Sequence, residues 1–352
     1  MQRRSFLKTL STVASFTAVA AVGGVAQRSA AAAAEPNLLK PKRLKPGATL
    51  GLVAPGSFIT EKELQESQQN LEALGFKVAY SKTILAKEGY LAGTDAQRAE
   101  ALHEMFSRND IHGIVAARGG YGCTRLLPLL DYELIQKHPK VLVGYSDITA
   151  LLFAIFRKTG LVCFHGPVGV STFNPFSTKF FTQVLMEPRD RLTLQSIEET
   201  SPKAAAKPVT IRNVTVRGRL VGGNLSLVVS LIGTPYDVDT ANKIIFLEEV
   251  GEEPYRVDRM ITQMLEAGKF AAAAGVALGV FSDCLAKPGE SGITSSFSVE
   301  EVLSDLLGHL DIPVVSGLSF GHIRNKFTLP FGGTAELNGL TQTLTLLEPA
   351  VV

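Results

Sequence analysis

The sequence of 352 residues has little net charge, few cysteines and no long, strongly apolar run, and each shortage excludes a class of protein. A formal net charge of +2 is not the strongly positive field of a nucleic-acid-binding protein. Cys123, Cys163 and Cys284 are too few and too far apart for a zinc site or a disulfide framework, so we expect buried free thiols. An apolar fraction of 45% without a low-complexity body excludes a disordered protein.

The first 34 residues differ from the rest of the chain. Arg3-Arg4 is followed by Ser-Phe-Leu-Lys, then by a mildly apolar stretch over 13–25 and alanines at 30–34. This pattern predicts a twin-arginine export signal, with an ordinary secretory signal or an uncleaved anchor as alternatives. The stretch is too short and too rich in Ala and Gly to form a stable membrane-spanning helix. We therefore expect cleavage near Ala34 and a periplasmic protein without a stable membrane span, with 31 basic and 33 acidic residues.

Short apolar segments alternate with helix-like segments along the first half of the remaining chain. The predicted strands cover 49–54, 78–80, 113–116, 141–145 and 162–164, and the predicted helices cover 61–74, 95–106, 126–137 and 148–158. Continuous apolar strands that alternate with helices indicate a parallel sheet covered on both faces. The fold class is therefore α/β, with a flavodoxin-like or glutamine-amidotransferase-like first domain.

The predicted boundaries place this first domain at 49–170, after a lead-in segment at 35–48. A proline-rich stretch at 171–208 is interpreted as a connection between domains. Residues 209–348 then show a mixed strand and helix pattern, which predicts a smaller mixed α/β domain with a barrel-like sheet. Ligands of parallel α/β sheets bind beyond the carboxyl ends of the strands, so the residues that follow each strand are the candidate site.

Ser146 directly follows the predicted strand 141–145 and directly precedes a helix. A serine on such a sharp strand-to-helix turn exposes its hydroxyl beside the positive end of the helix, as a nucleophile requires. The local string departs from the hydrolase pattern G-x-S-x-G at Ile148. A helix N-cap is the structural alternative for this serine.

A nucleophilic serine needs a base, and the base needs an orienting acid. Four of the six histidines are interpreted as surface or capping groups, namely His103, His112, His138 and His309. His165 and His322 remain as candidate bases. His165 ends a strand and faces the same rim as Ser146, and His322 lies in a glycine-flanked loop directly after a strand. Glu248 and Glu249 end an apolar strand and are the candidate acids, with a solvated strand end as the alternative.

Several motifs together resemble the LD-carboxypeptidase family, which contains the murein tetrapeptide carboxypeptidases. They are Gly119-Gly120-Tyr121-Gly122, Gly144-Tyr145-Ser146-Asp147, His165-Gly166-Pro167, Leu247-Glu248-Glu249-Val250-Gly251-Glu252 with Pro254-Tyr255-Arg256 and Asp258-Arg259, and Gly321-His322. The resemblance extends from about Gly47 to Leu347, which is nearly the whole chain after the signal.

The resemblance implies a serine peptidase with a Ser-Glu-His triad. Ser146 is then the nucleophile, His322 the general base and Glu248 the orienting acid. Glu248 is preferred to Glu249 because the acid of the family directly follows the Phe-Leu pair. The acid and the base come from the second domain, so the active site is expected between the domains, and His165 becomes a structural residue at its rim.

The implied reaction removes the terminal D-alanine from the tetrapeptide stem of peptidoglycan, in stem peptides or muropeptides. The backbone N–H groups of Gly120 and Asp147 are the expected oxyanion donors. The reaction implied by the resemblance requires no cofactor and no metal. The resemblance also suggests that the protein is a homodimer. The expected substrate-binding residues are Gly119, Tyr121, Arg118 and Arg256, of which the two arginines are suited to bind a carboxylate.

Two other functions stay open on the sequence alone. The same family includes immunity peptidases that cleave a peptide-nucleotide antibiotic, and these differ in substrate only. A non-catalytic exported protein that binds muropeptides belongs to a different class. A binding protein needs no activated hydroxyl, so the Ser146 and His322 motifs favour an enzyme.

Overall fold

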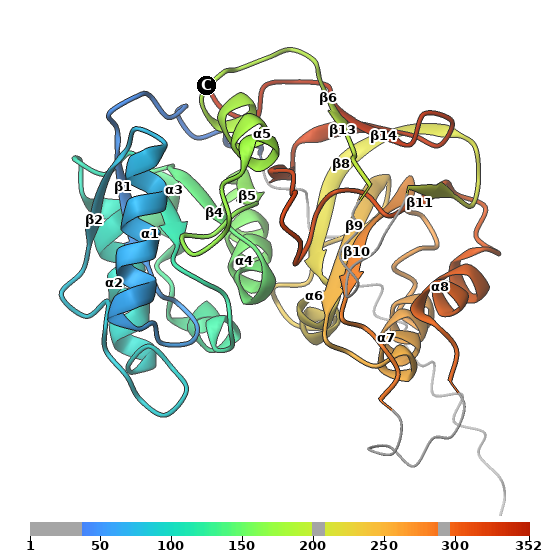
Figure 1. Cartoon of the computed structure of the whole chain (residues 1–352), viewed down its shortest axis with the longest axis horizontal. Coiled ribbons are helices and arrows are strands. Elements are labelled where there is room, and N and C mark those ends of the chain that lie inside the picture. Colours follow the sequence, from blue (N-terminus) through green and yellow to red (C-terminus); the bar gives the residue numbers. More distant parts are fainter. Residues whose placement is uncertain (1–36, 199–207, 288–295) are drawn as a thin grey trace, which may run out of the picture. The chain divides into compact units, whose positions relative to one another are not determined.

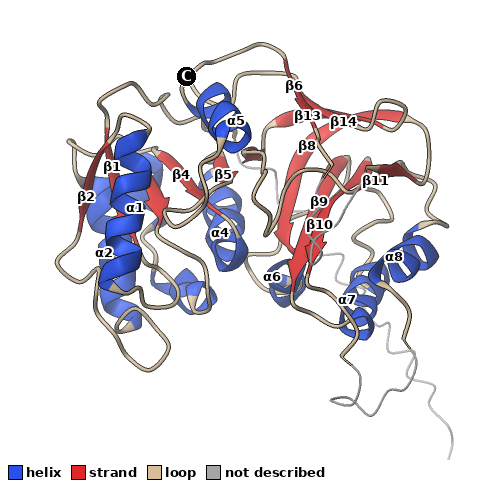
Figure 2. Ribbon diagram, viewed as in Figure 1, coloured by secondary structure: helices blue, strands red, loops and turns tan. Residues whose placement is uncertain are grey.

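The computed structural model describes residues 37–198, 208–287 and 296–352, and the expected export signal lies outside these ranges. The chain from Glu35 onward forms one unit that contains two sheets (Figures 1 and 2). Within the described residues, no helix has both the length and the apolar character needed to cross a membrane.

The first sheet has the strand order β12-β5-β4-β3-β1-β2. Its strands are β1 (Thr49–Val53), β2 (Lys77–Tyr80), β3 (Gly113–Ala116), β4 (Val141–Gly144), β5 (Cys163–His165) and β12 (Leu329–Phe331). Strands β1 to β5 run parallel, in the order 2-1-3-4-5 of flavodoxin-like folds. Every residue of β3 and β4 is buried, which explains why their sequences are continuously apolar.

Helices cover both faces of this sheet (Figure 2). They are α1 (Glu61–Ala73), α2 (Asp95–Ser107), α3 (Tyr132–Lys137), α4 (Thr149–Thr159) and α5 (Pro175–Leu185). Helix α3 packs against both α2 and α4. Helix α1 begins with a capping box in which Thr60 and Glu63 exchange hydrogen bonds, and α4 ends at Gly160 in the left-handed conformation.

The second sheet is the larger one and has the order β6-β14-β13-β8-β9-β10-β11-β7. Its strands are β6 (Leu192–Gln195), β7 (Val209–Thr210), β8 (Thr215–Asn224), β9 (Lys243–Val250), β10 (Gly275–Ser282), β11 (Val314–Ser316), β13 (Thr334–Asn338) and β14 (Thr343–Leu346). Its helices are α6 (Leu225–Leu231), α7 (Pro254–Glu266) and α8 (Val299–Leu307). The sheet mixes parallel and antiparallel pairs, and in the described part of the chain no pairing joins β6 to β7 and closes it into a barrel.

The two sheets are joined near the carboxyl end of β4. Strand β12 comes from the C-terminal part of the chain, yet it pairs with β5 of the first sheet through Leu329 and His165. Strand β8 of the second sheet contacts both β12 and the turn that carries Ser146. The backbone N–H of Asn224, at the end of β8, donates to Thr149 Oγ1 over 3.1 Å. The candidate residues of both halves therefore meet in one region.

Two local expectations are corrected by the structure, and one strand was missed. The expected helix at 126–137 is divided into a 3-10 helix that contains Pro128 and helix α3, which begins after the N-cap Asp131. The stretch at 171–208, expected as a connection, contains α5 and β6. Strand β12 was not expected because it is only three residues long and contains a proline, which weakens any local strand pattern.

Candidate active site

Ser146 occupies the turn between β4 and α4 in a conformation that side chains rarely adopt. Its φ is +63°, in the left-handed region that favours glycine. A 3-10 turn, Ser146–Ile148 (η2), follows at once and leads into α4. The side chain is partly exposed. Strained, partly exposed residues of this kind concentrate at functional sites, because the surrounding structure must hold them in place.

The glycines that follow β3 lie directly against this turn. A Cβ atom at position 119 would lie 2.8 Å from Ser146 Cβ and 2.9 Å from its Oγ, so only glycine fits beside the serine. Gly120 has a φ of +109° and is exposed. Its neighbour Tyr121 donates its backbone N–H to Ser57 Oγ over 3.1 Å, which fixes the loop after β3 to the loop after β1.

The buried side chain of Asp147 contacts the same loops. Its Oδ2 accepts the backbone N–H of Cys123 over 2.9 Å. Burial raises the pKa of this carboxyl group, and the hydrogen bond from Cys123 opposes that rise. A Cβ at Gly56 would lie 2.8 Å from the same oxygen. The loops after β1, β3 and β4 therefore converge on Asp147.

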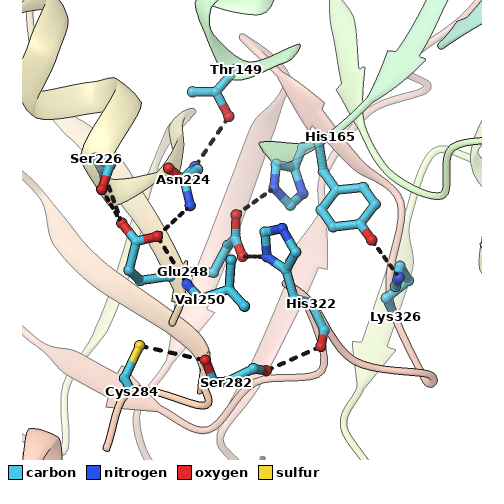
Figure 3. A network of polar contacts seen from close by, with 12 residues as sticks. Thr149, His165, Asn224, Ser226, Glu248, Val250, Ser282, Cys284, His322 and Lys326 are labelled. Atoms are coloured by element: carbon cyan, nitrogen blue, oxygen red, sulfur yellow. Dashed lines mark hydrogen bonds and ion pairs between the residues drawn. The ribbon is translucent and has the colours of Figure 1, made fainter. Parts of the chain in front are cut away.

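Glu248, near the end of β9, forms a close pair with His322, whose side chain is partly exposed (Figure 3). Glu248 is fully buried, and its Oε2 lies 2.7 Å from Nδ1 of His322. Burial by itself raises the pKa of Glu248, but the imidazoles of His322 and His165 outweigh it and hold that pKa well below its ordinary range. The carboxylate is therefore ionised and positioned to orient the imidazole.

The histidine reaches the nucleophile turn through an aromatic contact. The ring of Tyr145, the residue before Ser146, packs edge to face against His322 with 4.8 Å between ring centroids. Within the described residues no hydrogen bond joins Ser146 Oγ to His322. Catalytic hydrogen bonds are often long in unliganded enzymes and shorten in the complex with substrate.

Glu249 has a different set of partners from Glu248. It is buried on the other side of β9, where it accepts hydrogen bonds from Asn224 Nδ2 (2.8 Å), the N–H and Oγ of Ser226 (2.8 and 2.7 Å) and the N–H of Val250 (2.9 Å). Burial raises its pKa, which the hydrogen bonds oppose. Glu249 anchors the start of α6, and only Glu248 reaches His322.

Two further residues of the site have contacts that sequence reasoning missed. His165, interpreted as a rim residue, is buried with its Nε2 only 3.6 Å from Oε1 of Glu248 (Figure 3). Lys326 is also buried; its Nζ lies 3.3 Å from the hydroxyl of Tyr145 and 4.4 Å from the centre of its ring. Their signals in the sequence were the glycine that follows His165 and the closeness of Lys326 to His322.

The expected carboxylate-binding arginines both have carboxylate partners already. Arg118 Nη1 lies 2.9 Å from Glu63 Oε1, with 39% of its side chain exposed. Arg256 Nη1 lies 3.6 Å from Glu252, and its Nε donates to the hydroxyl of Tyr255 over 3.0 Å.

A pocket of about 580 Å³ adjoins the nucleophile turn. Its lining includes Gly120, Tyr121 and Asp147 on the side of the first sheet and Ser226 and Tyr236 on the other. Tyr121 is 52% exposed, so the expected substrate residue stands open to solvent at this pocket.

Family comparisons cover both halves of the chain. The family model described as "LD-carboxypeptidase N-terminal domain" matches residues 50–166, and the one described as "LD-carboxypeptidase C-terminal domain" matches residues 217–337. A Bacillus subtilis protein named "Probable murein peptide carboxypeptidase" is 38% identical over 309 residues, which cover 86% of this chain and 93% of that protein. The chain belongs to the LD-carboxypeptidase family. It is therefore a carboxypeptidase, and the predicted family and enzyme class are confirmed.

Further relatives and solved structures are similar to this chain in sequence and in fold. The murein tetrapeptide carboxypeptidase of Pseudomonas aeruginosa is 33% identical over 300 residues, 82% of this chain and 93% of that protein. The crystal structure of a muramoyltetrapeptide carboxypeptidase from Oxalobacter formigenes has a TM-score of 0.72 at 31% identity, covering 85% of this chain and 98% of that one. The structure of MccF with glutamyl sulfamoyl guanosine has a TM-score of 0.80 at 25% identity, covering 89% and 100%. The predicted α/β fold class is confirmed.

Proposed function

We propose that this LD-carboxypeptidase family member removes the terminal D-alanine from the tetrapeptide stem of peptidoglycan, with Ser146 as nucleophile, His322 as general base and Glu248 as orienting acid. The observation that supports this most strongly is the 2.7 Å contact between the buried Glu248 and His322, beside a serine with a φ of +63°. The substrate assignment draws on the names of the relatives in Bacillus subtilis and Pseudomonas aeruginosa.

The proposed reaction passes through an acyl-enzyme. Because Nδ1 of His322 faces Glu248, Nε2 is the nitrogen that accepts the proton from Ser146 Oγ. The serine oxygen bonds to the carbonyl carbon of the third stem residue, the C–N bond breaks, and His322 gives the proton to the departing amine of D-alanine. A water molecule, deprotonated by His322, then hydrolyses the ester and frees Ser146.

The oxyanion of the tetrahedral intermediate needs donors that are already in place. We assign this role to the backbone N–H groups of Gly120 and Asp147, from the loop after β3 and the turn after β4. The position of Gly119 supports this, because a Cβ there would lie 3.4 Å from the Asp147 nitrogen and 2.9 Å from Ser146 Oγ. Loss of one such donor typically costs about 2.7–4 kcal/mol of transition-state stabilisation.

The free carboxylate of the substrate needs a cation, and Arg118 is the better supported of the two expected arginines. It directly precedes Gly119, and its side chain is partly exposed although it contacts Glu63. A substrate carboxylate can share this guanidinium, whose five N–H donors exceed what one carboxylate uses. The contacts of Arg256 are with its neighbours Tyr255 and Glu252, so its role in binding stays the weaker proposal.

The cellular location and the oligomeric state of the protein are also proposed. We propose export by the twin-arginine signal with cleavage near Ala34, so that the enzyme trims stems in the periplasm, on the wall or on released muropeptides. We further propose a homodimer, as the family resemblance implies. Light scattering of the mature protein tests the dimer, and a monomeric mass at micromolar concentration contradicts it.

A second candidate substrate is favoured by one structural likeness. The fold resembles MccF bound to glutamyl sulfamoyl guanosine with a TM-score of 0.80, so cleavage of an aminoacyl nucleotide is the alternative. The deciding experiment offers the purified enzyme disaccharide tetrapeptide in one reaction and an acidic aminoacyl sulfamoyl nucleoside in another. Release of D-alanine alone supports the proposal, and cleavage of the nucleoside alone supports the alternative. No product from either, with binding of muropeptide, supports a binding protein.

A further inference from the structure

We propose that His165 is a positioning residue of the triad. From the end of β5 it holds Oε1 of Glu248, so that the acid is fixed by two imidazoles, one on each of its oxygens. The inference rests on the proposed function, because it assigns His165 a role through Glu248. It replaces the interpretation of His165 as a structural residue at the rim.

Buried polar atoms of His165 and Glu248 that lack hydrogen-bond partners support this role. Across the described residues, very few buried side-chain polar atoms have no hydrogen-bond partner, and both nitrogens of His165 and Oε1 of Glu248 are among them. Nε2 of His165 lies 3.6 Å from that oxygen, a little beyond hydrogen-bonding distance. The other oxygen, Oε2, is occupied by His322 at 2.7 Å. Figure 3 shows the carboxylate of Glu248 with a dashed line to each of the two histidines.

Because Glu248 is buried, a second hydrogen-bond partner stabilises its carboxylate. Glu248 is fully buried, and a buried charge that lacks partners is strongly destabilising. A typical N–H···O bond is about 2.9–3.0 Å long, so a shift of about 0.6 Å converts the present contact into a hydrogen bond. His165 in the tautomer that carries hydrogen on Nε2 is the donor that completes the coordination of Glu248.

The place of His165 in the fold links the acid to the strand of the nucleophile. His165 is paired with Gly144 in the β4–β5 ladder, two residues before Ser146. Glu248 belongs to β9 of the second sheet. The contact between His165 and Glu248 therefore sets the position of the acid relative to the nucleophile turn, which the bond between Glu248 and His322 alone does not do.

Aromatic rings hold the imidazole in this orientation. Phe246 and Phe320 pack edge to face on it with centroid separations of 5.5 and 6.2 Å, and Tyr145 lies at 5.9 Å. The titratable groups that face His165 are Glu248 from β9 and Tyr145 from the turn after β4, with His322 behind Glu248. A ring packed in this way directs Nε2 at one target.

Two substitutions separate a positioning role from a packing role. His165→Phe keeps an aromatic ring packed against the surrounding aromatic side chains and removes the hydrogen-bond donor. His165→Gln keeps an amide donor and removes the ring. We expect the Phe variant to lose about 10- to 100-fold in kcat with little change in KM, and the Gln variant to recover part of that loss. A purely structural residue gives the opposite order, with Phe the more active variant, and that order overturns the proposal.

A double substitution tests whether His165 acts through Glu248. Glu248→Gln removes the charge that His165 is proposed to hold. If His165 acts through that charge, His165→Phe has no further effect on kcat in the Glu248→Gln background. Effects that multiply as independent losses overturn the proposal. Thermal unfolding of each variant checks that the fold is retained.

A second readout keeps this test separate from the substrate assignment. The rate at which Ser146 reacts with a serine-directed fluorophosphonate depends on the triad and not on the stem peptide. If the wild-type protein reacts but releases no D-alanine, the substrate proposal fails and the order of the His165 variants is read from the phosphonate rates. If the wild-type protein neither reacts nor releases D-alanine, both proposals fail.

Discussion

At the scale of single residues, the site depends on positions where only one side chain fits. Ser146 has a strained φ of +63°. The absence of a side chain at Gly119 leaves room for the side chain of Ser146. We expect Gly119→Ala to displace Ser146 and to lower kcat by about 100-fold, the usual effect of a misplacement near 1 Å. Steady-state kinetics on the tetrapeptide measure this loss.

A matched glycine separates this effect from backbone strain. Gly268 has a φ of +70° and nothing within 4 Å of a Cβ placed there. Gly268→Ala is expected to cost about 1–2 kcal/mol of stability through the left-handed backbone and to leave kcat unchanged. Equal kcat values for the two alanine variants contradict the proposed packing of Gly119 on the nucleophile.

Arg118 gives a second prediction at this scale. If its guanidinium binds the free carboxylate of the substrate, Arg118→Ala raises KM for the tetrapeptide about tenfold or more, because a charge-assisted hydrogen bond contributes about 1.5–3 kcal/mol. The same variant is expected to leave unchanged the weak hydrolysis of a tetrapeptide whose C-terminus is amidated. An equal rise in KM for both peptides contradicts this role.

The residues of the site differ in how far the sequence predicted them. Ser146, Glu248 and His322 lie at or after the ends of predicted strands and belong to recognisable motifs, so the sequence predicted them as candidates. The structure places Glu248 beside His322. The contact between His165 and Glu248 was missed because it joins β5 to β9, strands of different sheets. No local pattern records which strand ends face each other across two sheets.

At the scale of secondary-structure elements, those with a clear local pattern were predicted well, and those that depend on a distant partner were not. The predicted strand at 113–116 and the predicted helix at 61–74 agree with β3 and α1 within a residue. Strand β12 was missed because its pairing with β5 depends on a partner far away in the chain. Short elements are defined by such tertiary contacts rather than by periodicity.

The anchoring of α6 by Glu249 gives a prediction at the scale of elements. Glu249→Gln keeps the shape but replaces the oxygen that accepts both bonds from Ser226, so we expect a loss of about 1–3 kcal/mol in the free energy of unfolding. The pKa of Glu249 is raised by burial, so its contribution to stability is present below the unfolded-state pKa and is lost as pH rises through the folded-state value.

The wild-type advantage over Glu249→Gln should therefore be larger at pH 5 than at pH 8. Urea unfolding at the two pH values measures it, and Glu72→Gln on the exposed surface of α1 serves as the control, with no change expected at either pH. An advantage that grows with rising pH contradicts the account of Glu249.

At the scale of the whole molecule, the chain crosses repeatedly between the two sheets. Strand β12 returns to the first sheet, and the last residue, Val352, exchanges backbone hydrogen bonds with Pro41 and Arg43 near the start of the described chain. The position of the acid and base relative to Ser146 therefore depends on contacts made by distant parts of the sequence.

The proposed export signal gives a prediction for the intact precursor. In a cell with twin-arginine transport, we expect the periplasmic form to begin near Glu35, and replacement of Arg3 and Arg4 by lysine to abolish export. Mass spectrometry of the periplasmic protein measures the new N-terminus. A membrane-bound form that still begins at Met1 indicates an uncleaved anchor and contradicts the prediction.

The decisive measurement for the proposed reaction is the release of D-alanine from a purified disaccharide tetrapeptide by the wild-type protein and by Ser146→Ala. The wild-type protein is expected to release D-alanine and to leave the tripeptide. The alanine variant is expected to retain the fold, by its thermal unfolding, and to lose about 10⁶-fold in kcat, as nucleophile removal does in serine peptidases. Release at an undiminished rate by Ser146→Ala would contradict the triad.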